Sequence, residues 1–367
     1  MKIECSVEKI KKTLMMVERV VGKNLTLPVL ESILFIAEGN TLTLRATNLS
    51  IGIETKIAAK VEKEGSVAIK GGTLSSLFSA LNTKDNSTIK LELNNNSLIF
   101  KTNNNNISLN SVPSDDFPTI PVIEGKNFSI KSRKFIEGVK SVYYSASISE
   151  IKPEIGSVYI YPDENFIYFV STDSFRLAEK KIKIKDNLDF PGVLIPFKNI
   201  IEIMKIFDDI EDELKITVQK NQIAISAPGI YLTSRIIDGI FPDYKQIIPK
   251  EATTEAVVLK QDFMSSLKIA NIFADKFNQV NFEIKPKSKI FKIKSKNSDI
   301  GENTTNISSA LNGEDVLTGF NYKYIYDCFQ SIPEDSLNLK LNGNNHAMII
   351  TGVGDNTFKY LIMPMNR

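Results

Sequence analysis

The sequence has very little of the chemistry on which enzymes and secreted proteins depend. It contains two cysteines, one histidine and no tryptophan among 367 residues. Cys5 and Cys328 lie far apart and neither has a Cys-x-x-Cys partner, so we expect two ordinary core residues rather than a disulfide or a thiolate metal site. His346 stands in a turn-like stretch without the neighbouring groups that acid–base catalysis or metal binding by histidine requires.

Long apolar runs are absent as well. No run approaches the roughly 18 residues of a membrane-spanning helix, and the first six residues lack the basic-then-apolar order of a signal peptide. We therefore expect a cytoplasmic protein with no membrane partner. The content of 42% hydrophobic and 24% charged residues is typical of a globular protein, and a net charge of +2 is too small to indicate nucleic-acid binding by itself.

Complete catalytic motifs are missing too. Gly71-Gly72-Thr73 lacks the Gly-Lys-Ser/Thr of a phosphate-binding loop, and Gly352-Val353-Gly354 lacks the third glycine and the following helix of a dinucleotide-binding loop. Acidic pairs such as Asp208-Asp209 fall in predicted turns or helix ends and do not form the spaced set of a two-metal site. We expect no catalytic residue, no metal ligand and no cofactor. An enzyme with an unrecognised carboxylate site stays open as an alternative.

What the sequence does contain is a repeat. The acidic turn followed by Phe-Pro in Asp238–Tyr244 also occurs at Ser114–Thr119, and Pro118, Pro242 and Pro364 are separated by 124 and 122 residues. Thr47-Asn48-Leu49 and Thr172-Asp173-Ser174 are 125 residues apart. A fixed period of this length predicts one structural unit used three times. We place the three predicted domains at residues 1–121, 127–245 and 246–367.

Each predicted domain combines two helices with six to eight strands, an α+β arrangement in which helices pack on β-sheets. The predicted helices are 6–22, 74–81, 132–145, 198–207, 261–273 and 322–331. The predicted strands are 32–37, 41–46, 51–58, 89–93, 97–102, 107–112, 157–161, 166–171, 178–183, 215–218, 222–227, 230–236, 280–284, 289–294, 306–311, 336–341, 347–351 and 359–363.

The charge is concentrated on the predicted helices. With their flanks they carry a formal charge of +7, whereas the rest of the chain carries −5. This contrast favours a helical surface facing a polyanion, although solvated helices that merely collect lysine would give the same count. Six helices around a ring would leave an opening of only about 9 Å, but twelve would leave roughly 28 Å, enough for a DNA duplex. The count therefore favours a homodimer closed head to tail that attracts DNA without reading its sequence.

Four motifs in order resemble the family of bacterial DNA polymerase III beta subunits, the sliding clamps or processivity factors of DNA replication, over the full length of the chain. They are Thr26–Leu30, Thr172–Ala178, Asp238–Tyr244 and Tyr360–Met365. The resemblance implies three DNA-clamp domains per chain and a head-to-tail dimeric ring around double-stranded DNA. It also implies a pocket that receives short motifs from the DNA polymerase III catalytic subunit, the clamp loader and other clamp-binding proteins.

By position, the resemblance implies specific site residues. The implied partner pocket comprises Ile155, Thr172, Ser174, Phe175, Arg176, Leu177, Pro242, Gln246, Ile247, Met363, Pro364 and Met365. The implied DNA contacts are Lys23, Asn24, Ser149 and Lys198, and the implied dimer contacts are Ile107 and Leu109 against Ile272 and Phe273. A last strand tucked into its sheet would also account for the Met-Pro-Met ending, and ordinary helix core would account for Ile272 and Phe273.

Three departures from the family pattern leave partner preference open. The family usually has Gly-His where Ser174-Phe175 stand, and some members have arginine where Gln246 stands. The ending Asn366-Arg367 also differs from the common Arg-Leu. A β-rich scaffold that binds only proteins is the third reading of the sequence, and salt-sensitive retention on DNA would separate it from a clamp.

Overall fold

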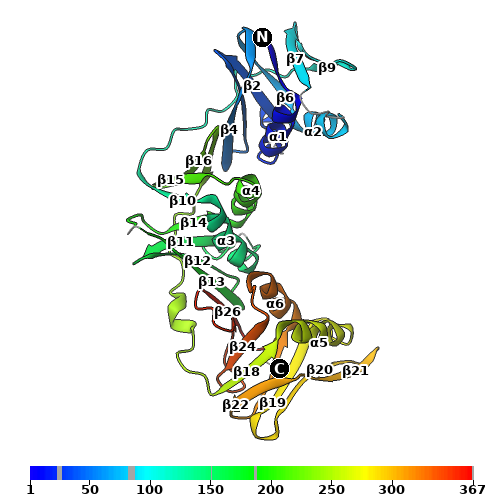
Figure 1. The fold of residues 1–367 in the computed structure, drawn as a ribbon, viewed down its shortest axis with the longest axis vertical. Coiled ribbons are helices and arrows are strands. Elements are labelled where there is room, and N and C mark those ends of the chain that lie inside the picture. Colours follow the sequence, from blue (N-terminus) through cyan, green and yellow to red (C-terminus); the bar gives the residue numbers. More distant parts are fainter. Residues whose placement is uncertain (23–26, 82–86, 150, 186–187, 366–367) are drawn as a thin grey trace. The chain divides into compact units, whose positions relative to one another are not determined.

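The computed structural model describes residues 1–22, 27–81, 87–149, 151–185 and 188–365, and these form two compact units (Figure 1). The first unit consists of residues 1–133 with 201–236, and the second of residues 134–200 with 237–367. The chain thus passes from one unit to the other and back within its central third. Each unit is described by itself.

The first unit is built on two antiparallel sheets. One has the strand order β5-β1-β7-β8-β9, and the other β10-β15-β16-β17-β4-β3-β2-β6. The helices of this unit are α1 (Val7–Glu18) and α2 (Gly71–Ala80), and α4 (Phe197–Phe207) enters it at residue 201. Its strands are β1 (Lys2–Ser6), β2 (Ser32–Glu38), β3 (Thr41–Thr47), β4 (Ile51–Ala58), β5 (Lys60–Lys63), β6 (Gly65–Lys70), β7 (Thr88–Asn94), β8 (Ser97–Lys101), β9 (Asn106–Asn110), β10 (Lys126–Lys131), β15 (Glu213–Gln219), β16 (Gln222–Ala227) and β17 (Ile230–Arg235).

The second unit has the same layered construction. Its sheets have the orders β14-β11-β12-β13-β26-β25-β24-β18-β22 and β21-β20-β19-β23. Its helices are α5 (Lys260–Ile272), α6 (Tyr322–Asp327) and most of α3 (Ser132–Val142). Its strands are β11 (Ser157–Asp163), β12 (Phe166–Thr172), β13 (Arg176–Lys183), β14 (Val193–Pro196), β18 (Thr254–Leu259), β19 (Gln279–Lys285), β20 (Ile290–Asn297), β21 (Gly301–Asn306), β22 (Ser309–Gly313), β23 (Val316–Asn321), β24 (Ser336–Leu341), β25 (Met348–Gly352) and β26 (Phe358–Ile362).

Amphipathic helices cover one face of the sheets in each unit. The Ser6 hydroxyl caps α1 by accepting a hydrogen bond from the Lys9 amide, and this helix buries Ile10, Leu14 and Val17. The spacing of these residues places them on a single helical face. Figure 1 shows α1 and α2 beside one another on the sheets of the first unit, and the two helices are in contact.

Over the described part of the chain, one pattern of strand, helix and three antiparallel strands recurs six times. It starts at β1, β6, β10, β14, β18 and β23. Successive pairs of this pattern exchange their first strands: β1 joins the sheet formed after α2, and β6 joins the sheet formed after α1. The same exchange relates β10 with β14 and β18 with β23. The repeat seen in the sequence is therefore a doubled one.

Two of the sheets are continuous across the sequence repeats. β4 pairs with β17 in the first unit, and we call this pairing the first joint. β13 pairs with β26 in the second unit, which we call the second joint. In both cases the last strand of one pattern pairs with the last strand of another, so main-chain hydrogen bonds connect segments that are far apart in sequence.

Several sequence-based predictions of elements need correction. Every strand that directly precedes a helix was missed, and so was β5. The single strand expected at 306–311 is two strands, because the chain leaves β20 after Asn306, buries Ile307, and continues as β22 beside β18. The first helix ends at Glu18 rather than at residue 22, since the Gly22 amide donates to the Leu30 carbonyl instead of continuing the helix.

Other predictions are confirmed. All six helices lie at the predicted places, and α6 continues as a 3-10 turn to Ser331. The asparagine-rich segment forms the hairpins of β7, β8 and β9. Cys5 and Cys328 are both buried free thiols, and burial raises the pKa of the Cys5 thiol to about 12.

Substituting alanine for two helical glycines should change the stability of the protein in opposite directions. A Cβ on Gly138 of α3 would lie 2.4 Å from the Phe169 ring, whereas a Cβ on Gly72 of α2 would meet no atom within 4 Å. We expect Gly138→Ala to lower the free energy of unfolding by about 1–3 kcal/mol through overpacking. Gly72→Ala should raise it by up to about 1 kcal/mol because alanine restricts the unfolded chain. Urea unfolding followed by circular dichroism checks both, and an equal loss in both variants would contradict the packing described for α3.

Candidate functional site

The turn between β12 and β13 positions the central motif of the sequence. The Thr172 hydroxyl donates to the Arg176 carbonyl at 2.6 Å and accepts from the Ser174 amide at 3.1 Å. Asp173 Oδ1 accepts from the amides of Phe175 and Arg176 at 2.9 and 3.0 Å. Ser174 has a φ of +77°, a left-handed conformation that glycine adopts most readily. The turn therefore holds a serine in a backbone conformation that is strained for a residue with a Cβ.

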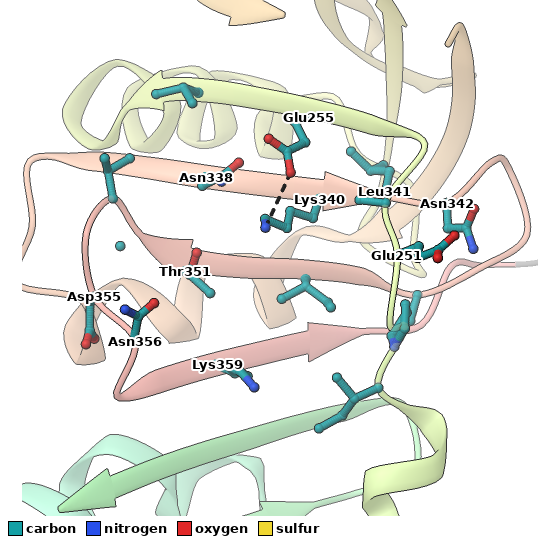
Figure 2. A pocket seen from close by; sticks show the side chains of 18 of the residues that line it. Glu251, Glu255, Asn338, Lys340, Leu341, Asn342, Thr351, Asp355, Asn356 and Lys359 are labelled. Carbon is teal, nitrogen blue, oxygen red and sulfur yellow. Dashed lines mark ion pairs between the residues drawn. The ribbon is translucent and has the colours of Figure 1, made fainter. Parts of the chain in front are cut away.

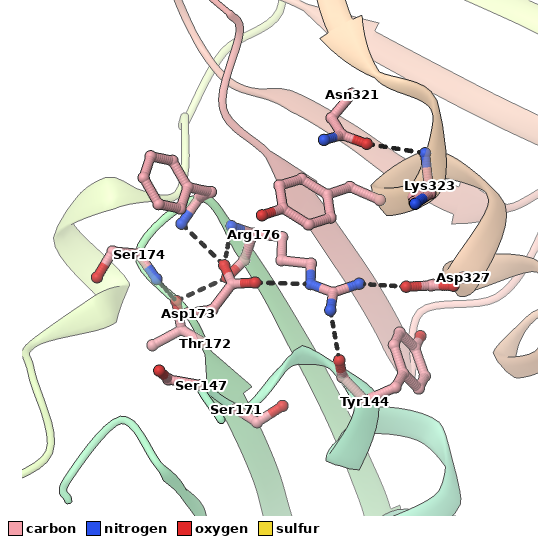
Figure 3. A network of polar contacts seen from close by, with 12 residues as sticks. Tyr144, Ser147, Ser171, Thr172, Asp173, Ser174, Arg176, Asn321, Lys323 and Asp327 are labelled. Carbon is pink, nitrogen blue, oxygen red and sulfur yellow. Dashed lines mark hydrogen bonds and ion pairs between the residues drawn. The ribbon is translucent and has the colours of Figure 1, made fainter. Parts of the chain in front are cut away.

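Arg176 is the centre of a polar network (Figure 3). Its Nε lies 2.9 Å from Asp173 Oδ2, and its two terminal nitrogens lie 2.5 Å from Asp327 Oδ2 and 2.7 Å from the Tyr144 carbonyl oxygen. The guanidinium carbon also lies 4.5 Å from the centre of the Tyr324 ring. The side chain is only 11% exposed, and its three hydrogen bonds connect the turn between β12 and β13 to α6 and to the turn 143–145 that follows α3.

The environment of Arg176 favours its charged form. Burial opposes the charge, but the ionisable Tyr360 nearby, the hydrogen bond to Asp327 and the charge of Asp173 outweigh it and raise the pKa of the guanidinium. Burial also raises the pKa of Tyr144 and of Tyr360. The Tyr144 hydroxyl lies 2.9 Å from the Ser331 hydroxyl, and the Tyr360 hydroxyl donates to the Tyr324 carbonyl at 2.8 Å.

An apolar surface lies beside this network at the second joint. Leu177 pairs with Leu361 across the sheet, and both belong to a buried cluster with Phe241 and Tyr244. Next to that floor, Phe175 (61%) before β13 and Met363 (39%) after β26 are exposed, and Ile247 (52%) is exposed three residues after Tyr244. The Met363 amide donates to the Phe175 carbonyl at 2.8 Å, which fixes the spacing of two of these side chains.

The structure brings part of the predicted pocket together and places the rest around it. Phe175, Arg176, Leu177 and Met363 meet on β13 and at the end of β26. Pro242 and Gln246 are exposed on the strap 237–250, where the Gln246 side chain donates to Asp243. Further residues of the prediction lie on other segments: Ile155 lies in the loop before β11 and accepts from the Ser147 amide, and the Met365 amide donates to the Gly319 carbonyl after Pro364.

A separate cavity of about 670 Å³ lies on the face of the sheet formed by β18, β24, β25 and β26 (Figure 2). The Lys340 ammonium and Glu255 carboxylate form an ion pair of 3.3 Å across neighbouring strands, and Asn338 and Lys359 also line the cavity. These side chains do not form a nucleophile–base pair. The cavity has the mixed charge of a solvated sheet face.

Two of the predicted DNA contacts line one cavity of the second unit. Ser149 and Lys198 both border a hollow of about 370 Å³, together with Ile148, Pro153 and Phe197. Lys23 and Asn24 lie outside the described residues. Sequence reasoning gave no reason for Ser149 and Lys198 to meet, because 49 residues separate them.

The predicted dimer residues lie at sheet edges or beside them. Ile107 and Leu109 alternate with exposed polar residues on β9, which is an edge strand. Ile272, at the end of α5, is 60% exposed, and Phe273 is partly buried. Phe273 lies about 3.9 Å from the Cβ position of Gly301 at the start of β21, so it adjoins another edge strand.

Side chains that could bind a metal ion do not cluster in the described residues. Among residues 1–22, 27–81, 87–149, 151–185 and 188–365, no three or more His, Cys, Asp and Glu side chains lie close enough together to hold a metal ion. Within the same residues, no helix has the length and apolarity that crossing a bilayer requires.

Comparison with known proteins decides the family. Three models of the DNA polymerase III beta subunit match successive parts of the chain: the N-terminal domain over residues 1–121, the central domain over 129–243 and the C-terminal domain over 245–366. The chain belongs to the DNA polymerase III beta subunit family. Its fold is the three-domain clamp fold, and it functions as a sliding clamp, a processivity subunit rather than an enzyme.

Individual relatives cover almost the whole chain. The beta sliding clamp of Buchnera aphidicola subsp. Acyrthosiphon pisum is 28% identical over 97% of both chains, and that of Bacillus subtilis is 26% identical over 95% of this chain and 94% of its own. The crystal structure of the beta subunit from Thermotoga maritima superposes with a TM-score of 0.94 at 23% identity, covering 100% of this chain and 99% of that one.

Sequence reasoning missed the residues that hold Arg176. Asp327 and Tyr324 lie on α6, about 150 residues away in sequence, and neither belongs to a recognisable motif. A single charged residue and a tyrosine in a short helix carry no signal of their own. Only the pairing of β13 with β26 places α6 beside the turn.

We expect Arg176→Lys to destabilise the protein strongly. Lysine cannot hold two carboxylates and a carbonyl in the planar geometry of a guanidinium, so the buried network would lose partners at a cost of about 3 kcal/mol. Arg133→Lys is the matched control, because Arg133 is 82% exposed and 3.9 Å from Glu211 and its change should lie within about 0.5 kcal/mol. Urea unfolding measures both, and equal effects would mean that the Arg176 network does not hold the second joint.

Proposed function

We propose that two copies of this chain close head to tail into a ring that encircles double-stranded DNA without reading its sequence. On that ring the chain tethers the DNA polymerase III catalytic subunit, is opened by a clamp loader, and receives other clamp-binding-motif proteins. We place this function in the cytoplasm. The three family domains, bounded at residues 1–121, 127–245 and 246–367, would give six domains around the ring.

The open sheet edges carry the head-to-tail proposal. In the described residues the recurring pattern has six last strands. Four of them are paired, β4 with β17 and β13 with β26. The two last strands left over are β9 and β21, and each ends its sheet. Exposed edge strands attract further strands. Pairing β9 of one copy with β21 of the other would give a third joint of the same kind and would close a ring of two chains.

Apolar side chains flank both open edges. Ile107 and Leu109 lie on β9, and Ile272 and Phe273 end the helix that packs beside β20 and β21. Ile300, directly before β21, is 61% exposed. Burying such a strip on dimerisation would be favourable at about 25 cal/mol per Å² of apolar surface.

Basic side chains on the exposed helix faces support the DNA proposal. Lys9 and Lys12 are exposed on α1, Arg133 and Lys140 on α3, and Lys268 on α5. Twelve helices around a ring leave an opening of roughly 28 Å, so these lysines and arginines would reach phosphates across water. Such contacts give salt-dependent attraction that permits sliding. Lys23, Asn24 and Ser149 are further proposed contacts, together with Lys198 at the start of α4.

The apolar surface at the second joint supports the partner proposal. Leu177 and Leu361 are buried, Phe175 and Met363 are exposed beside them, and Ile247 is exposed on the segment 237–250. Methionine adapts its shape to different ligands, so one surface can accept apolar side chains from several partner motifs. Ile155, Thr172, Ser174, Pro242, Gln246, Pro364 and Met365 complete the proposed pocket.

We expect Ile272→Asp to weaken the dimer at least about tenfold, since it places a charge in an apolar contact. Leu317→Asp is the matched control: Leu317 is 61% exposed, close to the 60% of Ile272, but lies on β23 at the opposite edge of the same sheet. Sedimentation equilibrium at micromolar concentration measures both. A monomeric unsubstituted chain, or equal weakening by both variants, would contradict the proposed interface.

A topological experiment tests the ring on DNA. The protein is loaded on nicked circular DNA with a clamp loader, and the circle is then cut once. We expect retention on the circle and rapid release after cutting, because a ring slides off a free end. Linear DNA with both ends blocked is the control and should retain the protein. Equal release from open and blocked ends would contradict the ring. A complete lack of retention at low salt would favour a scaffold that binds only proteins.

A further inference from the structure

The turn at the first joint has the same hydrogen bonds as the turn at the second. The Thr47 hydroxyl donates to the Ile51 carbonyl at 3.0 Å and accepts from the Leu49 amide at 3.0 Å. Asn48 Oδ1 accepts from the amides of Ser50 and Ile51 at 3.0 and 2.9 Å. Leu49 has a φ of +71°, against +77° for Ser174. Thr47–Ile51 is therefore a copy of Thr172–Arg176 at the level of single atoms.

The copy extends across the sheet. At the first joint the Arg235 amide donates to the Ser50 carbonyl at 2.8 Å, and at the second joint the Met363 amide donates to the Phe175 carbonyl at the same distance. One step further along each strand, Gly52 pairs with Thr233, and Leu177 pairs with Leu361. The backbone frame beneath the proposed partner pocket thus occurs twice in each chain.

The chain segment that crosses each frame is also repeated. Pro118 lies at the first joint and follows Phe117, and Pro242 follows Phe241, which packs with Leu177 and Leu361 at the second joint. The two phenylalanines are buried to a similar degree, 8% and 7% exposed. Phe117 packs on the sheet beside Leu34 and Ala68. Pro118 lines a cavity of about 190 Å³ at the first joint.

The side chains on the two frames have opposite chemistry. Phe175 and Met363, the exposed apolar walls at the second joint, correspond to Ser50 and Arg235 at the first. The buried floor residue Leu361 corresponds to Thr233, which is 6% exposed. Three apolar groups of the proposed pocket, Phe175, Leu361 and Met363, are therefore replaced by polar ones at the first joint.

The place of Leu177 is taken by a different part of the chain. Its counterpart is Gly52, and a Cβ there would lie 3.2 Å from Cγ1 of Ile120. Ile120 belongs to the segment that crosses the frame, and it lines the cavity at the first joint. The cavity is smaller than the roughly 300 Å³ of ordinary ligand pockets. Ile120 thus supplies at the first joint the apolar floor that Leu177 supplies at the second.

We propose that the first joint is a closed copy of the partner pocket. The side chains of Ser50, Thr233 and Arg235, not the backbone, determine that an apolar peptide binds only at the second joint. This inference rests on the proposed function, since it presupposes that the second joint binds such a peptide. Ser50, Thr233 and Arg235 are then the specificity determinants of the clamp, and Ile120 already provides an apolar floor at the first joint.

Exchanging the walls tests the proposal. The probe is a fluorescein-labelled decapeptide with a Leu-Leu-Phe core and polar flanks. Fluorescence anisotropy measures its affinity for the full chain, and a titration at high concentration gives the number of peptides bound per chain. Variant A, Phe175→Ser with Met363→Arg, gives the second joint the walls of the first. Variant B, Ser50→Phe with Thr233→Val and Arg235→Met, gives the first joint the walls of the second. Thermal melting of each variant verifies folding. We expect both variants to fold, because the same backbone frame accommodates the incoming residues, or a close relative of them, at the other joint.

We expect one peptide per unsubstituted chain, loss of at least tenfold in affinity for variant A, and two peptides per chain for variant B. Combining A with B should restore one peptide per chain, now at the first joint, where a photoreactive group on the peptide labels residues 47–52 or 233–235. If variant B melts normally but binds one peptide, the proposal is overturned while the second-joint pocket stands. If the unsubstituted chain binds none, the partner pocket itself fails.

Discussion

The pairing of last strands at each joint is the interaction on which the rest of this structure depends. The last strand of each recurring pattern has one row of main-chain groups that its own pattern leaves unpaired. Such an edge is a binding surface for another strand. Within the chain, β4 meets β17 and β13 meets β26. The edges of β9 and β21 remain. Four edges of this kind are thus paired and two are open in the described chain, which is the basis for the proposed closure by a second copy.

Because the joints are made by main-chain hydrogen bonds, they constrain side chains only weakly. The same turn and the same interstrand bond occur with Ser50 and Arg235 at one joint and with Phe175 and Met363 at the other. A frame of this kind can be copied and then given a new function by changing a few exposed residues. The repeated backbone provides the position, and side chains that differ between copies provide the chemistry.

The sequence predicted the repeat and the helices because both have clear periodic signals. It did not predict β10 or β18, since each runs into its helix without a glycine, proline or asparagine turn to mark the boundary. The Thr172–Leu177 segment was predicted as part of the site from its motif, and its geometry follows from local Asx and threonine hydrogen bonds. Asp327 was not predicted, because its role depends on a sheet pairing between segments distant in sequence.

The two joints also differ in what holds them together. At the first joint Ile51 is 3% exposed and Ile120 packs over Gly52, so apolar contacts fill the frame. At the position equivalent to Ile51, the second joint has Arg176, whose partners lie on α6 and on the turn 143–145 that follows α3. The charged network of Arg176 thus holds the second joint where apolar packing holds the first. It leaves the apolar side chains of Phe175 and Met363, which belong to the proposed partner pocket, exposed.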